Sequence, residues 1–271
     1  MAIEQGPLCS RLGATVDGAG PETLVFLNGF GTEQTVWRHQ VESLRGRYRT
    51  VTFDHVGSGR SQIDHYAPAR YASLHDYADD VLALVDELAA DRFSLVGHSV
   101  GGTLGAIVSI AEPDRCRRLV MIGASPRYLN APGYVGGFEP ADIEGVLAAM
   151  ATDYQAWAAG FSTQVAANPD TPGVAAQYAE FLRSLRPDIA QSSLRTIFTS
   201  DMRSILPKIP VPTMIVQATA DIAVPAPVAH YLKANIPDAQ LREVAFAGHL
   251  PHMLAPAAIT SLIAEFLDGA G

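Results

Sequence analysis

Short, wholly apolar runs alternate along most of the chain with stretches whose apolar residues recur every three to four positions. The apolar runs are rich in Val, Ile, Leu and Phe and are bounded by Gly, Pro or Asn, which predicts strands buried on both faces of a mostly parallel sheet. These predicted strands cover residues 23–27, 48–53, 93–96, 119–122, 213–217 and 241–244. The intervening stretches predict helices at about residues 34–44, 73–88, 99–111, 226–235 and 256–267. This alternation is typical of a doubly wound α/β core.

Polar residues predict where two of these helices begin. Thr32 is expected to cap the helix at 34–44. Ser73 is expected to cap the helix at 73–88, with Asp76 and Asp79 in the first turns, where negative charge suits the helix dipole.

The alternation stops between residues 128 and 204, where no strand-like run occurs. Helical patterns at about 140–150, 154–167, 174–185 and 189–199 fill this stretch, and Gly and Pro separate them. A block of helices inserted between strands of an α/β sheet predicts a lid. We therefore divide the chain into a first core part at 1–126, a helical lid at 127–204 and a second core part at 205–271.

The strand-to-helix passage at residues 93–105 contains Gly97-x-Ser99-x-Gly101, the pattern of a nucleophile elbow. The tight turn places the serine in a strained backbone conformation, and side chains two residues to either side would collide with the strand and the helix. Gly102 and Gly105 would let that helix lie close to the sheet. The alternative is a glycine-rich turn whose serine is incidental.

A serine nucleophile needs a base, and the base needs an orienting acid. In a nucleophile-elbow enzyme the acid follows a strand after the serine, and the histidine comes last. Asp221 lies four residues beyond the predicted strand at 213–217 and is the candidate acid. Asp201 and Asp238 compete with it, but neither closes a buried strand. A plain turn or capping aspartate is the alternative for Asp221.

The candidate base is His249, which follows the predicted strand at 241–244. Gly248 gives the backbone room to present this imidazole to the carboxyl edge of the sheet. His252 lies three residues further on and is the less favoured alternative, because the Gly-His placement matches the hydrolase pattern.

Two backbone amides are expected to form an oxyanion hole. One belongs to Val100, the residue after the nucleophile, and the other to Phe30, in the loop after the first buried strand. A tight turn without catalytic role is the alternative for the loop at 28–31. His98 is expected to be a packed, hydrogen-bonded neighbour of the nucleophile and not a second base.

Composition narrows the class of protein. The formal net charge of −9 argues against nucleic-acid or anionic-membrane partners, and 48% hydrophobic residues indicate a well-packed globular protein.

Cys9 and Cys116 show no metal or redox spacing, and the glycine-rich loop at 54–61 lacks a phosphate-binding pattern. Residues 1–7 carry no secretory-signal pattern and no run is long enough to span a membrane, so we expect a cytoplasmic location.

Four segments together resemble one α/β-hydrolase subfamily, which contains the bacterial stress-response regulator RsbQ and the plant strigolactone and karrikin receptors. They are residues 125–130 (SPRYLN), 136–139 (GGFE), 97–101 (GHSVG) and 248–252 (GHLPH). The resemblance covers nearly the whole chain and implies a V-shaped lid of four helices over an apolar pocket that holds the serine. The positions it implies as pocket lining are Phe30, His98, Val100, Tyr128, Trp157, Phe161, Ala223 and His249. Asn28 departs from the histidine or proline that is frequent there.

The sequence therefore predicts a serine hydrolase that needs no cofactor or metal and cleaves an ester or lactone of a small, largely apolar molecule. The main alternative is a small-molecule receptor with slow hydrolysis and a signalling protein partner, because the resembling family contains such members. Haloperoxidase or C–C hydrolase chemistry is a third option. Haloalkane dehalogenase chemistry is disfavoured because it needs a carboxylate where Ser99 stands.

Overall fold

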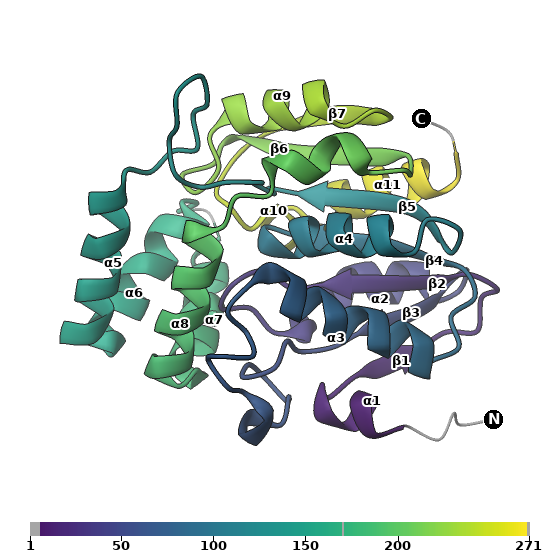
Figure 1. The fold of residues 1–271 in the computed structure, drawn as a ribbon, viewed down its shortest axis with the longest axis horizontal. Coiled ribbons are helices and arrows are strands. Elements are labelled where there is room, and N and C mark those ends of the chain that lie inside the picture. The colour runs from purple at the N-terminus through teal and green to yellow at the C-terminus, as the bar shows by residue number, and fades with distance from the viewer. Residues whose placement is uncertain (1–5, 170, 270–271) are drawn as a thin grey trace.

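The computed structural model describes residues 6–169 and 171–269, so the expectation about a secretory signal falls largely on residues outside this range. Within these described ranges, seven strands form one sheet in the order β1-β3-β2-β4-β5-β6-β7 (Figure 1). Their bounds are β1 Thr15–Asp17, β2 Thr23–Leu27, β3 Arg49–Thr52, β4 Phe93–His98, β5 Cys116–Ile122, β6 Thr213–Ala220 and β7 Ala239–Ala247. Only β1 pairs antiparallel, with β3, and the other pairs are parallel. This is the predicted mostly parallel α/β sheet.

Strand β2 shows why the central runs are apolar at every position. All five of its residues are buried. Val25 and Leu27 pack into the hydrophobic core on one side of the sheet, and Leu24 and Phe26 pack into the core on the other side. Alternate side chains of a strand point to opposite faces, so a strand covered on both sides needs apolar residues throughout.

Helices cover both faces of this sheet, with α3 and α4 on one face and α2 and α11 on the other (Figure 1). The core helices are α1 Pro7–Arg11, α2 Arg38–Leu44, α3 Leu74–Glu87, α4 Val100–Ala111, α9 Ala226–Asn235, α10 Pro251–Leu254 and α11 Pro256–Leu267. The predicted cap of α3 is confirmed, because Ser73 and Asp76 form a reciprocal capping box.

The prediction that Thr32 caps a continuous helix at 34–44 is wrong. The segment begins as a 3₁₀ turn, Gln34–Trp37, whose N-cap residue is Glu33, and becomes α-helical at Arg38. The Thr32 hydroxyl instead donates to the carbonyl of Gly29 and closes the preceding loop.

Four helices leave the core between β5 and β6: α5 Pro140–Thr152, α6 Tyr154–Ala166, α7 Pro172–Ser184 and α8 Pro187–Thr199. We call this group the helical insertion. Helix α5 packs against α6 and α8, and α6 packs against α7. Proline occupies the first turn of α5, α7 and α8, and the Asp153 side chain caps α6. The group stands beside one end of the sheet (Figure 1).

Candidate active site

Ser99 lies in the sharp turn between β4 and α4 and has φ 54° and ψ −124°, a conformation that non-glycine residues adopt rarely. A Cβ atom on Gly97 would come within 2.3 Å of the Gly101 backbone. A Cβ atom on Gly101 would come within 2.4 Å of the Leu27 carbonyl oxygen. The flanking glycines are therefore required by backbone contacts, as the steric argument from the sequence predicts.

The next two glycines set the distance between α4 and β5. A Cβ atom on Gly102 would lie 2.7 Å from Cβ of Ala124, and one on Gly105 would lie 2.7 Å from Cδ1 of Leu119. Both contacts are too short for real side chains, so these glycines let α4 pack closely against β5 and the residues that follow it.

The structure brings Ser99, His249 and Asp221 into one hydrogen-bonded chain. The Ser99 Oγ lies 2.9 Å from Nε2 of His249, and Nδ1 of His249 lies 2.8 Å from Oδ2 of Asp221. A carboxylate only accepts hydrogen bonds, so Nδ1 carries the proton and Nε2 presents its lone pair to the serine hydroxyl. This is the arrangement in which an imidazole can take the proton of a serine.

Asp221 follows directly after β6, which extends three residues beyond the predicted end of that strand. Its side chain is fully buried, and its second oxygen, Oδ1, accepts hydrogen bonds from the amides of Ala223 and Val224. The two competing aspartates lie elsewhere: Asp201 pairs with arginines, and Asp238 is an exposed turn residue.

The loop that carries His249 is held by the helical insertion. Gly248 has φ 109°, and a Cβ atom there would lie 2.2 Å from the carbonyl oxygen of Ala166 at the end of α6. The His249 amide donates to the carbonyl of Val165, also in α6 (2.8 Å). The position of the candidate base therefore depends on where α6 lies.

Two further histidines pack behind His249. The centroid of the His98 ring lies 4.9 Å from that of His249 and 4.5 Å from that of His252, and His252 stacks on Trp37. His98 donates from Nε2 to the carbonyl of His249 (2.6 Å). Burial lowers the pKa of His252 to about 3 and that of His98 well below its ordinary value, so both stay neutral. His98 is the packed, hydrogen-bonded neighbour that the sequence predicts.

The loop at residues 28–31 is fixed by a buried polar network centred on Asn28 and Asp54. Asn28 donates to the carbonyl of Phe53 (2.8 Å) and accepts from the indole of Trp37 (2.9 Å). The Asp54 carboxylate accepts from the amide and the side chain of Gln34. Asn28, which departs from the family pattern, thus uses both its side-chain oxygen and its side-chain nitrogen in hydrogen bonds that hold this loop.

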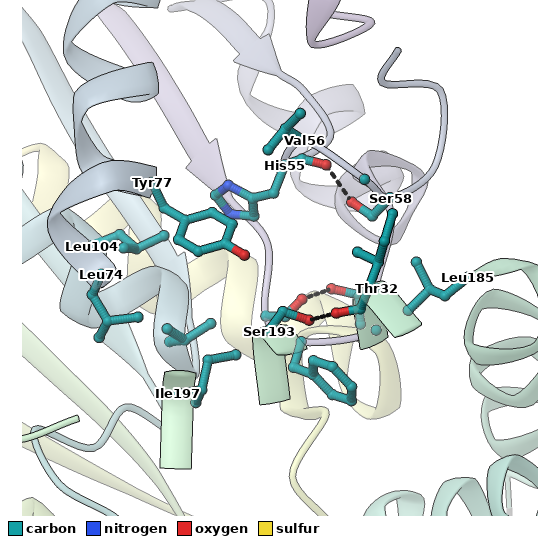
Figure 2. Close-up of a pocket in the computed structure, with 16 residues that line it drawn as sticks. Thr32, His55, Val56, Ser58, Leu74, Tyr77, Leu104, Leu185, Ser193 and Ile197 are labelled. Carbon is teal, nitrogen blue, oxygen red and sulfur yellow. Dashed lines mark hydrogen bonds between the residues drawn. The ribbon is translucent and has the colours of Figure 1, made fainter. Parts of the chain in front are cut away.

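Phe30 and Val100 both belong to the wall of one cavity of about 60 Å³, which Figure 2 shows in close-up. Val100 is the first residue of α4, so its N–H has no acceptor within the helix. Within the described residues no hydrogen bond uses the Phe30 amide either. Both donors are therefore available to a ligand.

The other predicted pocket residues lie in different surroundings. The Tyr128 hydroxyl lies 3.2 Å from Oγ of Ser99, in contact with the triad. Trp157 and Phe161 stack on each other at 5.0 Å within the helical insertion. The 60 Å³ cavity is walled by the loops at 29–32 and 55–58, by Leu185 and by helices α3, α4 and α8. Of the predicted lining residues, Phe30 and Val100 belong to this wall, and the other six do not: His98, Tyr128, Trp157, Phe161, Ala223 and His249. Ser99 is not part of the wall, although the next residue, Val100, is. Substrate contacts by the six residues outside the wall stay a prediction.

A model of the α/β hydrolase fold matches residues 22–256. The chain belongs to this family. A karrikin insensitive 2 receptor of Petunia hybrida is 43% identical over 88% of this chain and 89% of its own, and a strigolactone esterase of Arabidopsis thaliana is 37% identical over 98% and 99%. The solved structure of a hydrolase from Oleispira antarctica has a TM-score of 0.93 at 32% identity, covering 97% of this chain and 96% of that one.

These relatives confirm the resemblance to the plant receptors that the sequence motifs indicate, and the fold class with it. Among the residues that the structure describes, no cluster of three or more His, Cys, Asp or Glu side chains could hold a metal ion. No helix in the described ranges has the length and apolar character to cross a membrane.

Proposed function

We propose that this member of the α/β-hydrolase family is a serine hydrolase that cleaves an ester or lactone of a small, largely apolar molecule. The observation that carries the proposal is the continuous hydrogen-bonded chain from Asp221 through His249 to Ser99, at the end of a strained elbow. The names of related proteins, among them a strigolactone esterase, support an ester or lactone as the substrate class.

In this mechanism His249 takes the Ser99 proton at Nε2 while Oγ attacks the substrate carbonyl carbon. Asp221 stabilises the imidazolium that forms, and its two hydrogen bonds from backbone amides hold the carboxylate in place. The developing oxyanion accepts hydrogen bonds from the amides of Phe30 and Val100. Each such donor contributes roughly 10²- to 10³-fold to the rate.

The tetrahedral intermediate collapses when His249 returns the proton to the leaving alcohol. A water molecule then takes the place of that alcohol, gives its proton to His249 and attacks the acyl-serine, and the second collapse releases the acid and restores the Ser99 hydroxyl. Tyr128, 3.2 Å from Oγ, can hydrogen-bond the serine in the free enzyme. Burial raises the pKa of Tyr128, so it keeps its proton throughout.

A stopped-flow time course of 4-nitrophenyl butyrate hydrolysis tests the proposal, with wild type and Ser99→Ala measured side by side. We expect sustained release of nitrophenolate in wild type and its loss in the variant. Equal rates in the two proteins would show that Ser99 is not the nucleophile.

A second candidate function is a small-molecule receptor that turns over slowly and signals to a protein partner. The 43% identity to a karrikin insensitive 2 receptor favours it, and the contact of α6 with the His249 loop offers a path from the site to the surface of the insertion. One burst of product equal to the enzyme concentration, followed by near silence, would support the receptor. Sustained turnover of many cycles per second would contradict it.

We propose a cytoplasmic location as well. Cys9 and Cys116 are both buried free thiols, which suits a reducing compartment. Fractionation of the source cells would test this, and recovery in an extracellular fraction would contradict it.

A further inference from the structure

The cavity beside the amides of Phe30 and Val100 extends to α3, where Tyr77 forms part of its wall. Figure 2 shows the Tyr77 ring pointing its hydroxyl into the space between α3, the loop of Thr32 and helix α8. Tyr77 is buried, with 7% of the residue's surface exposed. A buried hydroxyl therefore faces a mostly apolar cavity whose wall includes Phe30 and Val100, the residues of the proposed oxyanion hole.

Five side chains of the cavity wall can donate a hydrogen bond, and four of them donate it to a backbone carbonyl. These four pairs are Thr32 to Gly29 (2.9 Å), His55 to Asn28 (3.2 Å), Ser58 to His55 (2.7 Å) and Ser193 to Ile189 (2.8 Å). The fifth is Tyr77, whose buried hydroxyl has no hydrogen-bond partner within the part of the chain that the structure describes. Tyr77 is thus the side-chain donor that the cavity leaves for a ligand.

The Tyr66 hydroxyl, also buried and without a hydrogen-bond partner in the described ranges, is the polar neighbour that contributes to the raised pKa of Tyr77. The Tyr77 side chain is held by aromatic neighbours. Its ring lies 4.9 Å from that of Tyr71 and meets the ring of His55 edge to face at 6.1 Å. Burial raises the pKa of Tyr77, so the phenol keeps its proton and remains a donor. An unpaired buried hydroxyl destabilises a fold, and native proteins contain few of them, which suggests that this one is paired when a ligand is bound.

We propose that the Tyr77 hydroxyl donates a hydrogen bond to a second oxygen of the substrate, so that the preferred substrate is a short-chain ester or lactone with a ketone, ether or hydroxyl oxygen on its acyl part. The inference rests on the proposed hydrolysis and names the substrate class for that same site. A cavity of about 60 Å³ is too small for a bulky leaving group, which assigns it to the acyl chain. A site that hydrogen-bonds a substrate oxygen discriminates against the analogue that lacks it.

Matched ester pairs test this proposal. Hydrolysis of 4-nitrophenyl 4-oxopentanoate is compared with that of 4-nitrophenyl pentanoate, and 5-oxohexanoate with hexanoate, in wild type and Tyr77→Phe. We expect the keto-to-alkyl ratio of kcat/KM to fall by about fivefold or more in the variant, as one hydrogen bond implies, for at least one pair. The alkyl esters are the internal reference for any general effect of Tyr77→Phe on the site. Comparing ratios between the two proteins cancels the different intrinsic reactivity of the esters.

Tyr71→Phe is the matched control, because the Tyr71 hydroxyl donates to Asp80 (2.8 Å) and Tyr71 does not border the cavity. This control should lose thermal stability and keep the wild-type keto-to-alkyl ratios. Tyr77→Phe removes an unpaired group, so its Tm should equal or exceed that of wild type. Unchanged ratios for both pairs in Tyr77→Phe, or a Tm loss as large as in Tyr71→Phe, would overturn the proposal.

Failure of this inference can be told apart from failure of the proposed hydrolysis. If wild type shows no Ser99-dependent cleavage of any of these esters, the proposed function fails and binding becomes the readout. The Tm of Ser99→Ala is then measured with ethyl 4-oxopentanoate and with ethyl pentanoate, each with and without Tyr77→Phe. A larger shift from the keto ester that disappears in the double variant supports the hydrogen bond, and equal shifts contradict it.

Discussion

The two side-chain oxygens of Asp221 have separate partners, and this determines how Asp221→Asn would affect the His249 imidazole. Oδ1 accepts from the amides of Ala223 and Val224, while Oδ2 faces Nδ1 of His249. In Asp221→Asn the amide oxygen has to stay with the two backbone donors, so the NH₂ group faces His249. The imidazole then takes the other tautomer and presents an N–H to Ser99, where a lone pair is needed. We expect kcat for 4-nitrophenyl butyrate to fall by about 10⁴ with the fold intact.

Asp238→Asn is the control for this change, because Asp238 is the exposed aspartate in the turn before β7. Its kcat should stay within about twofold of wild type, since exposed substitutions away from special features have small effects. Circular dichroism would establish that both variants are folded. A loss of less than tenfold in Asp221→Asn would mean that another group orients the imidazole.

Ser99, Asp221 and His249 could be found in the sequence because each lies just beyond a strand, and the carboxyl ends of parallel strands meet at one edge of a sheet. The contacts of Tyr77 and Tyr128 could not be found in this way. Tyr77 lies within α3 and repeats at the helical spacing of core residues, so nothing local separates it from packing. Whether its hydroxyl has a partner depends on loops and helices far away in the chain.

At the scale of elements, the strand and helix predictions succeed where one pattern continues over several residues. The predicted range of α11 agrees in its bounds, and the four helices of the insertion agree within about two residues at each end. Helix α1 and strand β1, with five and three residues, are too short to show a periodicity and are missed. The cap at Thr32 is wrong because the choice between a 3₁₀ and an α-helical first turn depends on Asp54, which binds the Gln34 amide from another loop.

An ion-pair cluster joins the segment before the helical insertion to the segment after it. Asp201 accepts from Arg203 (2.7 and 2.8 Å) and from Arg127 (2.6 Å), and the Met202 amide donates to the carbonyl of Pro126. Arg203, with a smaller contribution from Arg127, lowers the pKa of Asp201 to about 2. Because a third of the Asp201 side chain is exposed, we discount this shift to about 1 kcal/mol of stability.

Asp201→Asn should therefore lower the free energy of unfolding by about 1 kcal/mol at pH 7, or Tm by roughly 2–4 °C. The folded-state pKa is the lower one, so the stabilisation is complete above the unfolded-state pKa of about 3.9 and is lost as the pH falls through about 2. Urea unfolding of both proteins from pH 7 to pH 2.5 measures the difference. A difference that grows on acidification would have the wrong sign and would contradict the assignment.

The glycines differ in whether close backbone contact requires them. Gly145 and Gly160 lie exposed within α5 and α6, and nothing lies within 4 Å of a Cβ atom built on either. Gly145→Ala and Gly160→Ala should each raise stability by about 0.4–1 kcal/mol. Gly101→Ala, whose Cβ would meet the Leu27 carbonyl at 2.4 Å, should cost about 1–3 kcal/mol and abolish hydrolysis. Urea midpoints would show opposite signs, and a stabilising Gly101→Ala would refute the elbow geometry.

At the scale of the whole molecule, the site is assembled from both parts of the sheet and from the insertion. The proposed nucleophile comes from the first part, and the proposed acid and base come from the second. Helix α6 of the insertion holds the His249 loop, and α8 borders the cavity. Opening the insertion would thus change the base and the cavity together. This coupling is what either an enzyme with a moving cover or a receptor requires.

The small cavity predicts how the molecule selects its substrate by length. A single water needs about 10–15 Å³, so a cavity of about 60 Å³ admits an acyl chain of only a few carbon atoms. Among 4-nitrophenyl acetate, butyrate, hexanoate and octanoate, kcat/KM should be highest for a short chain and should fall by about tenfold or more at octanoate.

The opposite trend, a rise of kcat/KM with acyl-chain length, would also have a predictable magnitude. Each methylene buried on binding contributes about 0.8 kcal/mol, which is roughly a fourfold gain in kcat/KM. If the helical insertion moved away from the site in solution, longer chains would be buried and kcat/KM would rise from butyrate to octanoate. A rising series would therefore show that the cavity expands when substrate enters. Substrate length would then be controlled by the motion of α5 to α8, and the cavity seen in this structure would be its closed state.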